Sequence, residues 1–256
     1  MISLPEVFVQ IPLAHRGLHA RAAGRIENSP AAVQAAAEAG YGVEVDVQLT
    51  ADDEAVVFHD AELDRLTDAT GPVRHRTLAE LERIPLKDST EGPRSLSHVL
   101  SILRGRVPAL IELKDQSGAF GPEAETLAAA VAAAITGYSG PVAVMSFNPH
   151  TVQHLARLAP TVPRGLTTMD FSGTEGLSPE HAEILTNIDT FGAVGASFIS
   201  HDRRSLDLPS VIRLRDRGIP VLTWTVRSPK DAQEAAHRAD NITFEGFVPR
   251  LPQGQG

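Results

Sequence analysis

Short apolar runs that alternate with segments of helical periodicity constrain the fold of this chain more than any other feature. The runs are rich in Val, Ile and Leu, whereas the segments between them are rich in Ala or Leu. This alternation is typical of repeated strand and helix units, in which helices cover a parallel sheet. The predicted strands lie at about residues 11–15, 43–47, 107–114, 142–147, 163–167, 197–200, 221–226 and 242–244.

Four helix starts support this interpretation, because each has a polar residue that can cap the helix, followed by proline at the first helical position. The pairs are Ser29-Pro30, Asn148-Pro149, Ser178-Pro179 and Ser228-Pro229. Eight parallel strands with helices between them suggest a closed barrel, and 256 residues is the usual length of one such barrel. We therefore expect an α/β fold, a TIM (β/α)8 barrel forming a single domain over residues 1–256.

One stretch departs from the repeat. Between Val47 and Val56 there are too few residues for the crossover helix that a parallel connection needs. The chain should therefore turn and return antiparallel to the second strand, with residues 55–59 as the returning arm. This hairpin is predicted to bring His59 close to Asp46, give or take one register step.

The segment that follows the hairpin is polar and irregular from about residue 61 to residue 103. It contains two short stretches of helical pattern, at residues 78–83 and 96–103. We interpret it as a small insertion after the second strand that caps the mouth of the barrel.

Composition excludes several kinds of partner and of chemistry. A formal net charge of −9 argues against a nucleic-acid backbone or an anionic membrane surface, since both favour a basic face. The absence of cysteine excludes disulfides and thiolate chemistry, so any catalysis must use oxygen and nitrogen groups. Residues 1–10 lack the pattern of a signal peptide, and no apolar run is long enough for stable membrane insertion. We expect a cytoplasmic enzyme with a small-molecule substrate; the sequence leaves its oligomeric state open.

Three carboxylates are placed where strand ends should bring them together. Glu44 and Asp46 are two residues apart in a strand whose odd positions are valines, so both carboxylates share one face. Converging acidic groups repel one another unless a cation or a shared proton neutralises them, and oxygen ligands favour Mg²⁺ or Ca²⁺. Glu112 ends a later apolar strand and is a candidate third ligand. The alternatives are a solvated edge strand for the first pair and ordinary ion pairing for Glu112.

Basic and titratable groups adjoin these carboxylates. Arg16 can direct two N–H groups at phosphate oxygens, and Lys114 lies on the same strand face as Glu112, where it could make a second phosphate contact. His15 and His59 are the natural proton donor and acceptor, because the ordinary pKa of imidazole is close to physiological pH. Together these residue types suit metal-assisted phosphoryl transfer.

Three further residues have both a structural and a functional interpretation. Glu27 and Asn28 precede the first capped helix, where an acidic turn is common, yet they could bind metal or substrate hydroxyls. Trp224 is the only tryptophan and ends a strand. It could form a wall of the substrate pocket or pack in the core. Of the remaining histidines, only His19 is close enough in sequence to the predicted site to be kept as a candidate.

In the order and spacing of these motifs the chain resembles the glycerophosphodiester phosphodiesterase family. The matching segments are His15-Arg16-Gly17, Glu27-Asn28, Glu44-Val45-Asp46-Val47 with Thr50 and Asp52, Val57-Phe58-His59-Asp60, Leu63 with Arg65 and Thr67, Glu112-Leu113-Lys114, Ser146-Phe147 and Trp224-Thr225-Val226. The resemblance covers nearly the whole chain. One departure is visible, because Thr243-Phe244-Glu245-Gly246 stands where the last strand of the family usually ends in a Thr-Asp pair.

The resemblance implies a TIM barrel with a small insertion after the second strand. It also implies one divalent cation, Mg²⁺ or Ca²⁺, held by Glu44, Asp46 and Glu112. His15 and His59 would be the catalytic pair, and Arg16 and Lys114 would hold phosphate. Family members cleave glycerophosphodiesters to glycerol 3-phosphate and an alcohol. Two alternatives remain: a lysophospholipase D-like phosphodiesterase acting on bulkier lipids, and a barrel that binds a phosphate ligand without catalysis.

Overall fold

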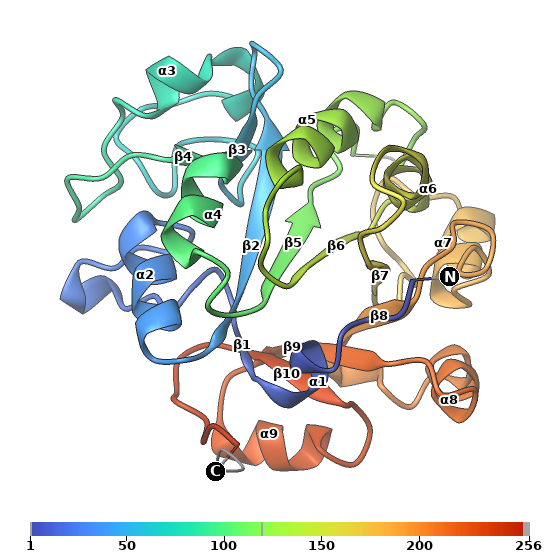
Figure 1. Ribbon diagram of the computed structural model, residues 1–256. Coiled ribbons are helices and arrows are strands. Elements are labelled where there is room, and N and C mark those ends of the chain that lie inside the picture. The colour runs from blue at the N-terminus through green and yellow to red at the C-terminus, as the bar shows by residue number, and fades with distance from the viewer. Residues whose placement is uncertain (1, 119, 253–256) are drawn as a thin grey trace.

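Eight parallel strands close into a ring in the computed structural model, which describes residues 2–118 and 120–252 (Figure 1). In order around the ring they are β1 (Leu13–Ala14), β2 (Gly42–Leu49), β5 (Ala109–Leu113), β6 (Val142–Ser146), β7 (Arg164–Thr168), β8 (Phe198–Asp202), β9 (Val221–Val226) and β10 (Asn241–Phe244). The first strand pairs with both β2 and β10, which closes the sheet on itself. The predicted TIM barrel is confirmed.

The first strand is shorter than the predicted 11–15, and a helix before it is the reason. Helix α1 (Val7–Gln10) ends where the N–H of Ile11 donates to the carbonyl of Val7. Pro12 then has no N–H to contribute to the sheet. Phe8 of α1 packs with Leu13 and other apolar side chains of the barrel interior, so the amino-terminal end of the barrel is filled with hydrophobic side chains.

Helices surround the ring on its outer side (Figure 1). They are α2 (Pro30–Glu38), α4 (Leu96–Leu103), α5 (Glu125–Ile135), α6 (Pro149–Leu158), α7 (Pro179–Thr186), α8 (Pro209–Asp216) and α9 (Pro229–Ala235), with single 3₁₀ turns η1 (Arg21–Ala23), η2 (Val73–His75) and η3 (Arg203–Ser205). At all four predicted helix starts the polar side chain accepts a backbone N–H from the first turn and proline occupies the first position. This cap satisfies one of the N–H groups that a helix start leaves without an intrahelical partner.

The predicted hairpin is confirmed. Strand β3 (Ala55–Val57) runs antiparallel to β2, with Val57 opposite Val47, and β4 (Arg94–Ser95) pairs with β3 outside the ring. In this register the N–H of Phe58 donates to the carbonyl of Asp46, so His59 follows directly at the level of the acidic strand face.

The segment after the hairpin has an apolar cluster of its own. Phe58, Leu63 and Val73 pack there with Leu81 of α3 (Leu78–Leu81), and Figure 1 shows this part of the chain at one side of the ring, next to β3. Helix α4, which the sequence analysis included in the insertion, instead contributes its buried side chains to the main core, together with residues of α2 and α5. It is the crossover helix that leads from β2 to β5.

Within residues 2–118 and 120–252, no helix combines the length and the apolar content that crossing a bilayer requires. Because the eight ring strands are parallel, their carboxyl ends meet at one rim of the barrel. That rim is where TIM barrels place polar and catalytic groups.

Candidate active site

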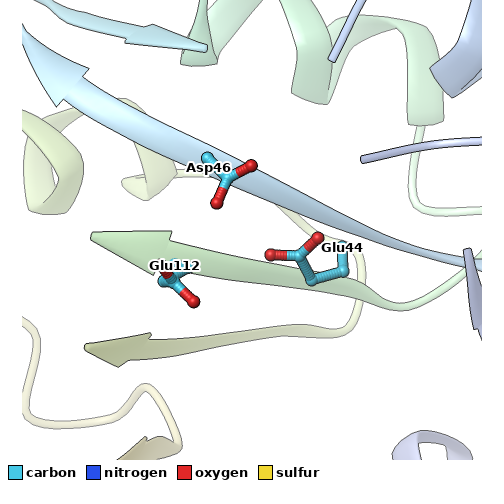
Figure 2. Close-up of side chains that lie close together, drawn as sticks. All are labelled: Glu44, Asp46 and Glu112. Atoms are coloured by element: carbon cyan, nitrogen blue, oxygen red, sulfur yellow. The ribbon is translucent and has the colours of Figure 1, made fainter. Parts of the chain in front are cut away.

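Three buried carboxylates meet inside the barrel at this rim. Val43, Val45 and Val47 of β2 pack outward into the main core, so the alternate side chains Glu44 and Asp46 face inward. Asp46 is in register with Glu112 of β5. One oxygen from each of the three carboxylates lies within 4.8 Å of the others, and the residues are only 2%, 1% and 6% exposed (Figure 2).

The protonation of Glu44 and that of Asp46 differ because the neighbours of the two side chains differ. Burial, followed by the charges of Asp46 and Glu112, raises the pKa of Glu44 well above its ordinary value. Burial also acts to raise the pKa of Asp46, but the positive charge of Lys114, with His59 and Arg16, outweighs it and lowers this pKa. Burial and repulsion therefore favour the protonated form of Glu44, whereas Asp46 is held in its ionised form.

The donor set fits a hard divalent cation. It supplies carboxylate oxygens only, it is buried, and repulsion among its members would be relieved by positive charge. The prediction that Glu44, Asp46 and Glu112 come together is consistent with this geometry, since they form a group within the described residues that could hold an ion.

Two basic side chains lie against the acidic cluster. The Lys114 ammonium is 2.7 Å from Asp46 Oδ1 and also donates to Glu112. Burial lowers the pKa of Lys114, but the charges of Asp46 and Glu112 outweigh burial and raise it, so the ammonium stays charged. Arg16 Nε lies 3.3 Å from Asp46 Oδ2.

A tight turn fixes the backbone of Arg16. Its φ of 56° is left-handed, and its N–H donates to Glu44 Oε2 at 3.0 Å. At the next residue, Gly17, a Cβ atom would lie 2.7 Å from the carbonyl carbon of Ala32. Only glycine therefore lets α2 approach the turn this closely.

Both candidate histidines line the same cavity, and each is held by a carboxylate. His15 follows β1, and its Nδ1–H donates to Glu245 Oε2 at 2.6 Å. His59 follows β3, and its Nδ1–H donates to Asp60 Oδ1 at 2.7 Å. Burial is the largest influence on His59 and lowers the pKa of its imidazole, although the charge of Asp46 acts in the opposite direction.

Asn28 and Glu27 support the cluster from the side. Asn28 Nδ2 donates to Asp46 Oδ2 at 2.9 Å, and its Oδ1 accepts the N–H of Asp46 at 3.2 Å. Glu27 accepts from Arg16 at 2.6 Å and from both terminal nitrogens of Arg65. Asn28 therefore orients a carboxylate of the cluster, and Glu27 orients an arginine beside it.

A cavity of about 540 Å³ contains the acidic cluster and both histidines. Its lining residues are His15, Arg16, Glu44, Asp46, His59, Glu112, Lys114, Met145, Phe147, Asp202, Arg203, Arg204, Trp224, Thr225, Arg227 and Thr243. Trp224 forms part of the wall, with its Nε1–H donating to the carbonyl of Ser200 and its ring edge-on to Phe147.

Sequence reasoning missed several residues at the cavity and beside it. Arg203 and Arg204 directly follow β8, so the rule that functional residues occur at the carboxyl ends of barrel strands would have found them. Glu245 follows β10 but was noted only as a departure from the family pattern. Its contact with His15 joins residues that are 230 positions apart.

Comparison with known proteins assigns the chain to a family. A sequence model of the glycerophosphoryl diester phosphodiesterase family matches residues 15–248. The chain belongs to this family. The match includes every site residue that the sequence analysis named, and it identifies the chain as a hydrolase of phosphodiesters.

Individual relatives agree with the assignment. The Bacillus subtilis protein YhdW, provisionally named a glycerophosphodiester phosphodiesterase, is 28% identical over 249 residues, covering 94% of each chain. The crystal structure of a glycerophosphodiester phosphodiesterase from Agrobacterium tumefaciens has a TM-score of 0.66 and 26% identity, covering 92% of this chain and 96% of that one. An Oleispira antarctica phosphodiesterase, whose structure contains the product sn-glycerol-3-phosphate, has a TM-score of 0.77 and 21% identity over 93% and 94% of the chains.

Proposed function

We propose that this member of the family hydrolyses glycerophosphodiesters to glycerol 3-phosphate and an alcohol, using a divalent cation, Mg²⁺ or Ca²⁺, and two histidines. The observation that carries the proposal is that three buried carboxylates share one cavity with His15 and His59. The presence of glycerol 3-phosphate in the Oleispira antarctica phosphodiesterase supports the substrate class.

Binding of the phosphodiester is assigned to the cationic side of the site. Glu44, Asp46 and Glu112 would hold the cation, which supplies positive charge to phosphodiester oxygens when bound. Arg16 and Lys114 add fixed positive charge that the carboxylates already orient. The phosphate would therefore be met by charges that need little rearrangement.

The two imidazoles move the protons. One accepts a proton from the attacking oxygen as the new P–O bond forms, and the other donates a proton to the departing alcohol as its P–O bond breaks. The attacking oxygen belongs to water or to the neighbouring glycerol 2-hydroxyl. In the second case water later opens a cyclic phosphate, and proximity makes the internal attack efficient. The lowered pKa of His59 keeps this imidazole neutral near pH 7, as a proton acceptor must be.

Release of glycerol 3-phosphate tests the proposal. Purified enzyme is assayed with Mg²⁺, with Ca²⁺ and with chelator, on water-soluble glycerophosphodiesters and on a lysophospholipid. We expect cation-dependent release from the soluble substrates. A barrel that only binds phosphate ligands would release none under any metal condition, and preference for the lysophospholipid would favour the lipid alternative.

Substitution of His59 tests the proton-transfer role. We expect His59→Ala to lower kcat by about 10²–10⁴-fold, the usual contribution of a general acid or base. Far-UV circular dichroism checks that the fold is unchanged. His98→Ala is the matched control, because His98 is exposed on α4 and lies outside the cavity. Full activity of the His59 variant would contradict the role.

A further inference from the structure

Glu245 and His15 are neighbours because two adjacent strands end at the same level. Ala14 of β1 is in register with Phe244 of β10. His15 directly follows Ala14, and Glu245 directly follows Phe244. The N–H of His15 donates to the carbonyl of Phe244 at 2.9 Å, and the N–H of Glu245 donates to the carbonyl of Val226 at 3.0 Å. These backbone hydrogen bonds of the barrel thus fix the main-chain positions from which both side chains extend.

The two carboxylate oxygens of Glu245 have different partners. Oε2 accepts the Nδ1–H of His15 at 2.6 Å, and Oε1 accepts the Nε–H of Arg227 at 2.7 Å. His19 Nε2 lies 3.6 Å from Oε2. The hydrogen bond from His15, followed by the influence of the nearby His19, holds the pKa of Glu245 well below its ordinary range, so the side chain, 19% exposed, is a carboxylate.

These contacts determine which nitrogen of His15 is available. Nδ1 carries the hydrogen that Glu245 accepts, and among residues 2–118 and 120–252 the hydrogen bond found for the His15 ring uses Nδ1 and leaves Nε2 unused. Since His15 lines the cavity, Nε2 is the ring nitrogen left to exchange a proton with a bound molecule.

We propose that Glu245 is a positioning residue that orients the His15 imidazole and fixes its tautomer, with Nδ1 protonated and Nε2 directed to the cavity. The inference rests on the proposed function, in which His15 transfers a proton. When Nε2 accepts a proton the ring becomes an imidazolium, and when Nε2 donates it the ring returns to neutral. In both directions Nδ1 keeps its hydrogen and Glu245 stays ionised, so no further reactant is needed.

The second histidine shows the same arrangement. Asp60 accepts the Nδ1–H of His59, and Arg65 donates to both Asp60 oxygens, as Arg227 donates to Glu245. Each imidazole is thus held by a carboxylate that an arginine orients in turn. For His59 the carboxylate is the next residue in the chain, whereas for His15 it comes from the other end of the barrel sequence.

Glu245 does not act as a fourth metal ligand in this arrangement. Both of its oxygens already accept hydrogen bonds from His15 and Arg227, and it is not part of the carboxylate group formed by Glu44, Asp46 and Glu112. Its effect on the reaction therefore passes through the imidazole.

Kinetics of Glu245 variants test the proposal. Glu245→Gln keeps an acceptor for Nδ1–H but removes the charge, and we expect kcat to fall about 10–100-fold while KM stays within about threefold. Glu245→Asp restores the charge and should recover part of the lost kcat. Glu234→Gln, an equal charge change on the exposed face of α9, is the control and should leave both constants unchanged. A Glu245→Gln enzyme that matches this control would overturn the proposal.

Two measurements separate positioning from a structural role. In a His15→Ala background, Glu245→Gln should cause no further loss of kcat, because a positioning residue has no effect without the group that it positions. A further tenfold loss there would contradict the inference.

Nitrogen-15 NMR of the His15 ring should show Nδ1 protonated in the unmodified protein and a shift towards Nε2 protonation in Glu245→Ala. This NMR measurement does not depend on catalytic activity. A protein that releases no glycerol 3-phosphate would refute the proposed function, but the protonation of the His15 ring would still show whether Glu245 sets its tautomer.

Discussion

At the scale of single residues, Glu44 is the group whose surroundings favour it least as an anion. It is buried, it has two carboxylates nearby, and within residues 2–118 and 120–252 its side chain accepts one hydrogen bond, from the backbone N–H of Arg16. Function and stability therefore favour different protonation states of Glu44. A cation site needs the ionised carboxylate, whereas the folded protein without metal favours the protonated form.

The variant Glu44→Gln tests this conflict. With chelator present, we expect its melting temperature to equal or exceed that of the unmodified protein, because the change removes a carboxyl group that burial and repulsion disfavour as an anion, and the amide oxygen can still accept from Arg16. The rise in melting temperature on adding Mg²⁺ or Ca²⁺ should be lost, since binding to the folded state is what produces it. Thermal unfolding with and without metal measures both effects. Glu183→Gln, exposed on α7, is the control, and a clear loss of metal-free stability specific to Glu44→Gln would contradict the argument.

His201 is a buried histidine that the proposed reaction does not use. The hydroxyl of Thr168 donates to its Nδ1 at 2.8 Å, and its Nε2–H donates to Ser205. This pattern needs a neutral ring. Burial lowers the pKa of His201 from 6.5 to about 4.

Stability should therefore depend on pH through His201. Between about pH 6.5 and pH 4 the unfolded chain binds a proton at this residue and the folded chain does not, so the free energy of unfolding falls as pH falls. The loss begins near pH 6.5, reaches at most about 3 kcal/mol, and stops growing near pH 4. Urea unfolding between pH 7 and pH 4 should show a shallower dependence for His201→Gln than for the unmodified protein. Equal slopes would refute the assignment; His98→Gln is the exposed control.

At the scale of elements, some capping residues only cap their own helix, whereas others also form hydrogen bonds to distant parts of the chain. Ser178 is exposed and makes one capping bond, accepting the N–H of His181 at 3.2 Å. Asn148 is fully buried; besides accepting the N–H of His150, its amide donates to Asp115 and to the carbonyl of Gly121. The same sequence signal thus marks an isolated cap at one helix and a junction between loops at another.

Alanine substitutions should separate the two kinds of cap. We expect Ser178→Ala to reduce the free energy of unfolding by about 1 kcal/mol, the usual cost of losing one cap. Asn148→Ala should cost about 2–4 kcal/mol, because it also leaves buried partners without hydrogen bonds. Chemical denaturation of both variants measures the difference, and equal losses would show that the additional bonds of Asn148 contribute little.

At the scale of the whole molecule, the barrel interior is filled partly by a large side chain that packs against a glycine on the neighbouring strand. Gly165 of β7 is in register with Phe198 of β8. A Cβ atom on this glycine would lie within 3.0 Å of three Phe198 ring atoms, and Phe198 is fully buried among apolar side chains near α1. Phe198 also packs with apolar side chains of β1, β5, β6 and β9, so the contact lies in the interior that these strands share.

Filling that space should destabilise the barrel. We expect Gly165→Ala to lower the free energy of unfolding by about 1–3 kcal/mol, because the Phe198 ring must move in a close-packed interior. The double variant Gly165→Ala with Phe198→Leu should lose less than the sum of its two single changes. Chemical denaturation of the three variants checks this, and strict additivity would contradict a direct steric conflict.

Much of the fold could be predicted because its signals are local. The alternation of apolar runs and helical segments predicted the ring, the cap and proline pairs predicted four helix starts, and a connection too short for a helix predicted the β2 and β3 hairpin. Boundaries were less accurate where local and tertiary effects compete. Residues 96–103 looked like part of an insertion by their polar surroundings, but their apolar face packs on the main core.

By itself the sequence determined which chemical groups this protein has and which strand faces carry them, since alternation along a strand fixes side-chain direction. Only the tertiary structure decided that Glu245 holds His15 and that Lys114 lies between Asp46 and Glu112. The physical reason is distance along the chain. Residues 230 positions apart share no periodicity or turn signal, and only the closure of β1 against β10 brings them within hydrogen-bonding distance.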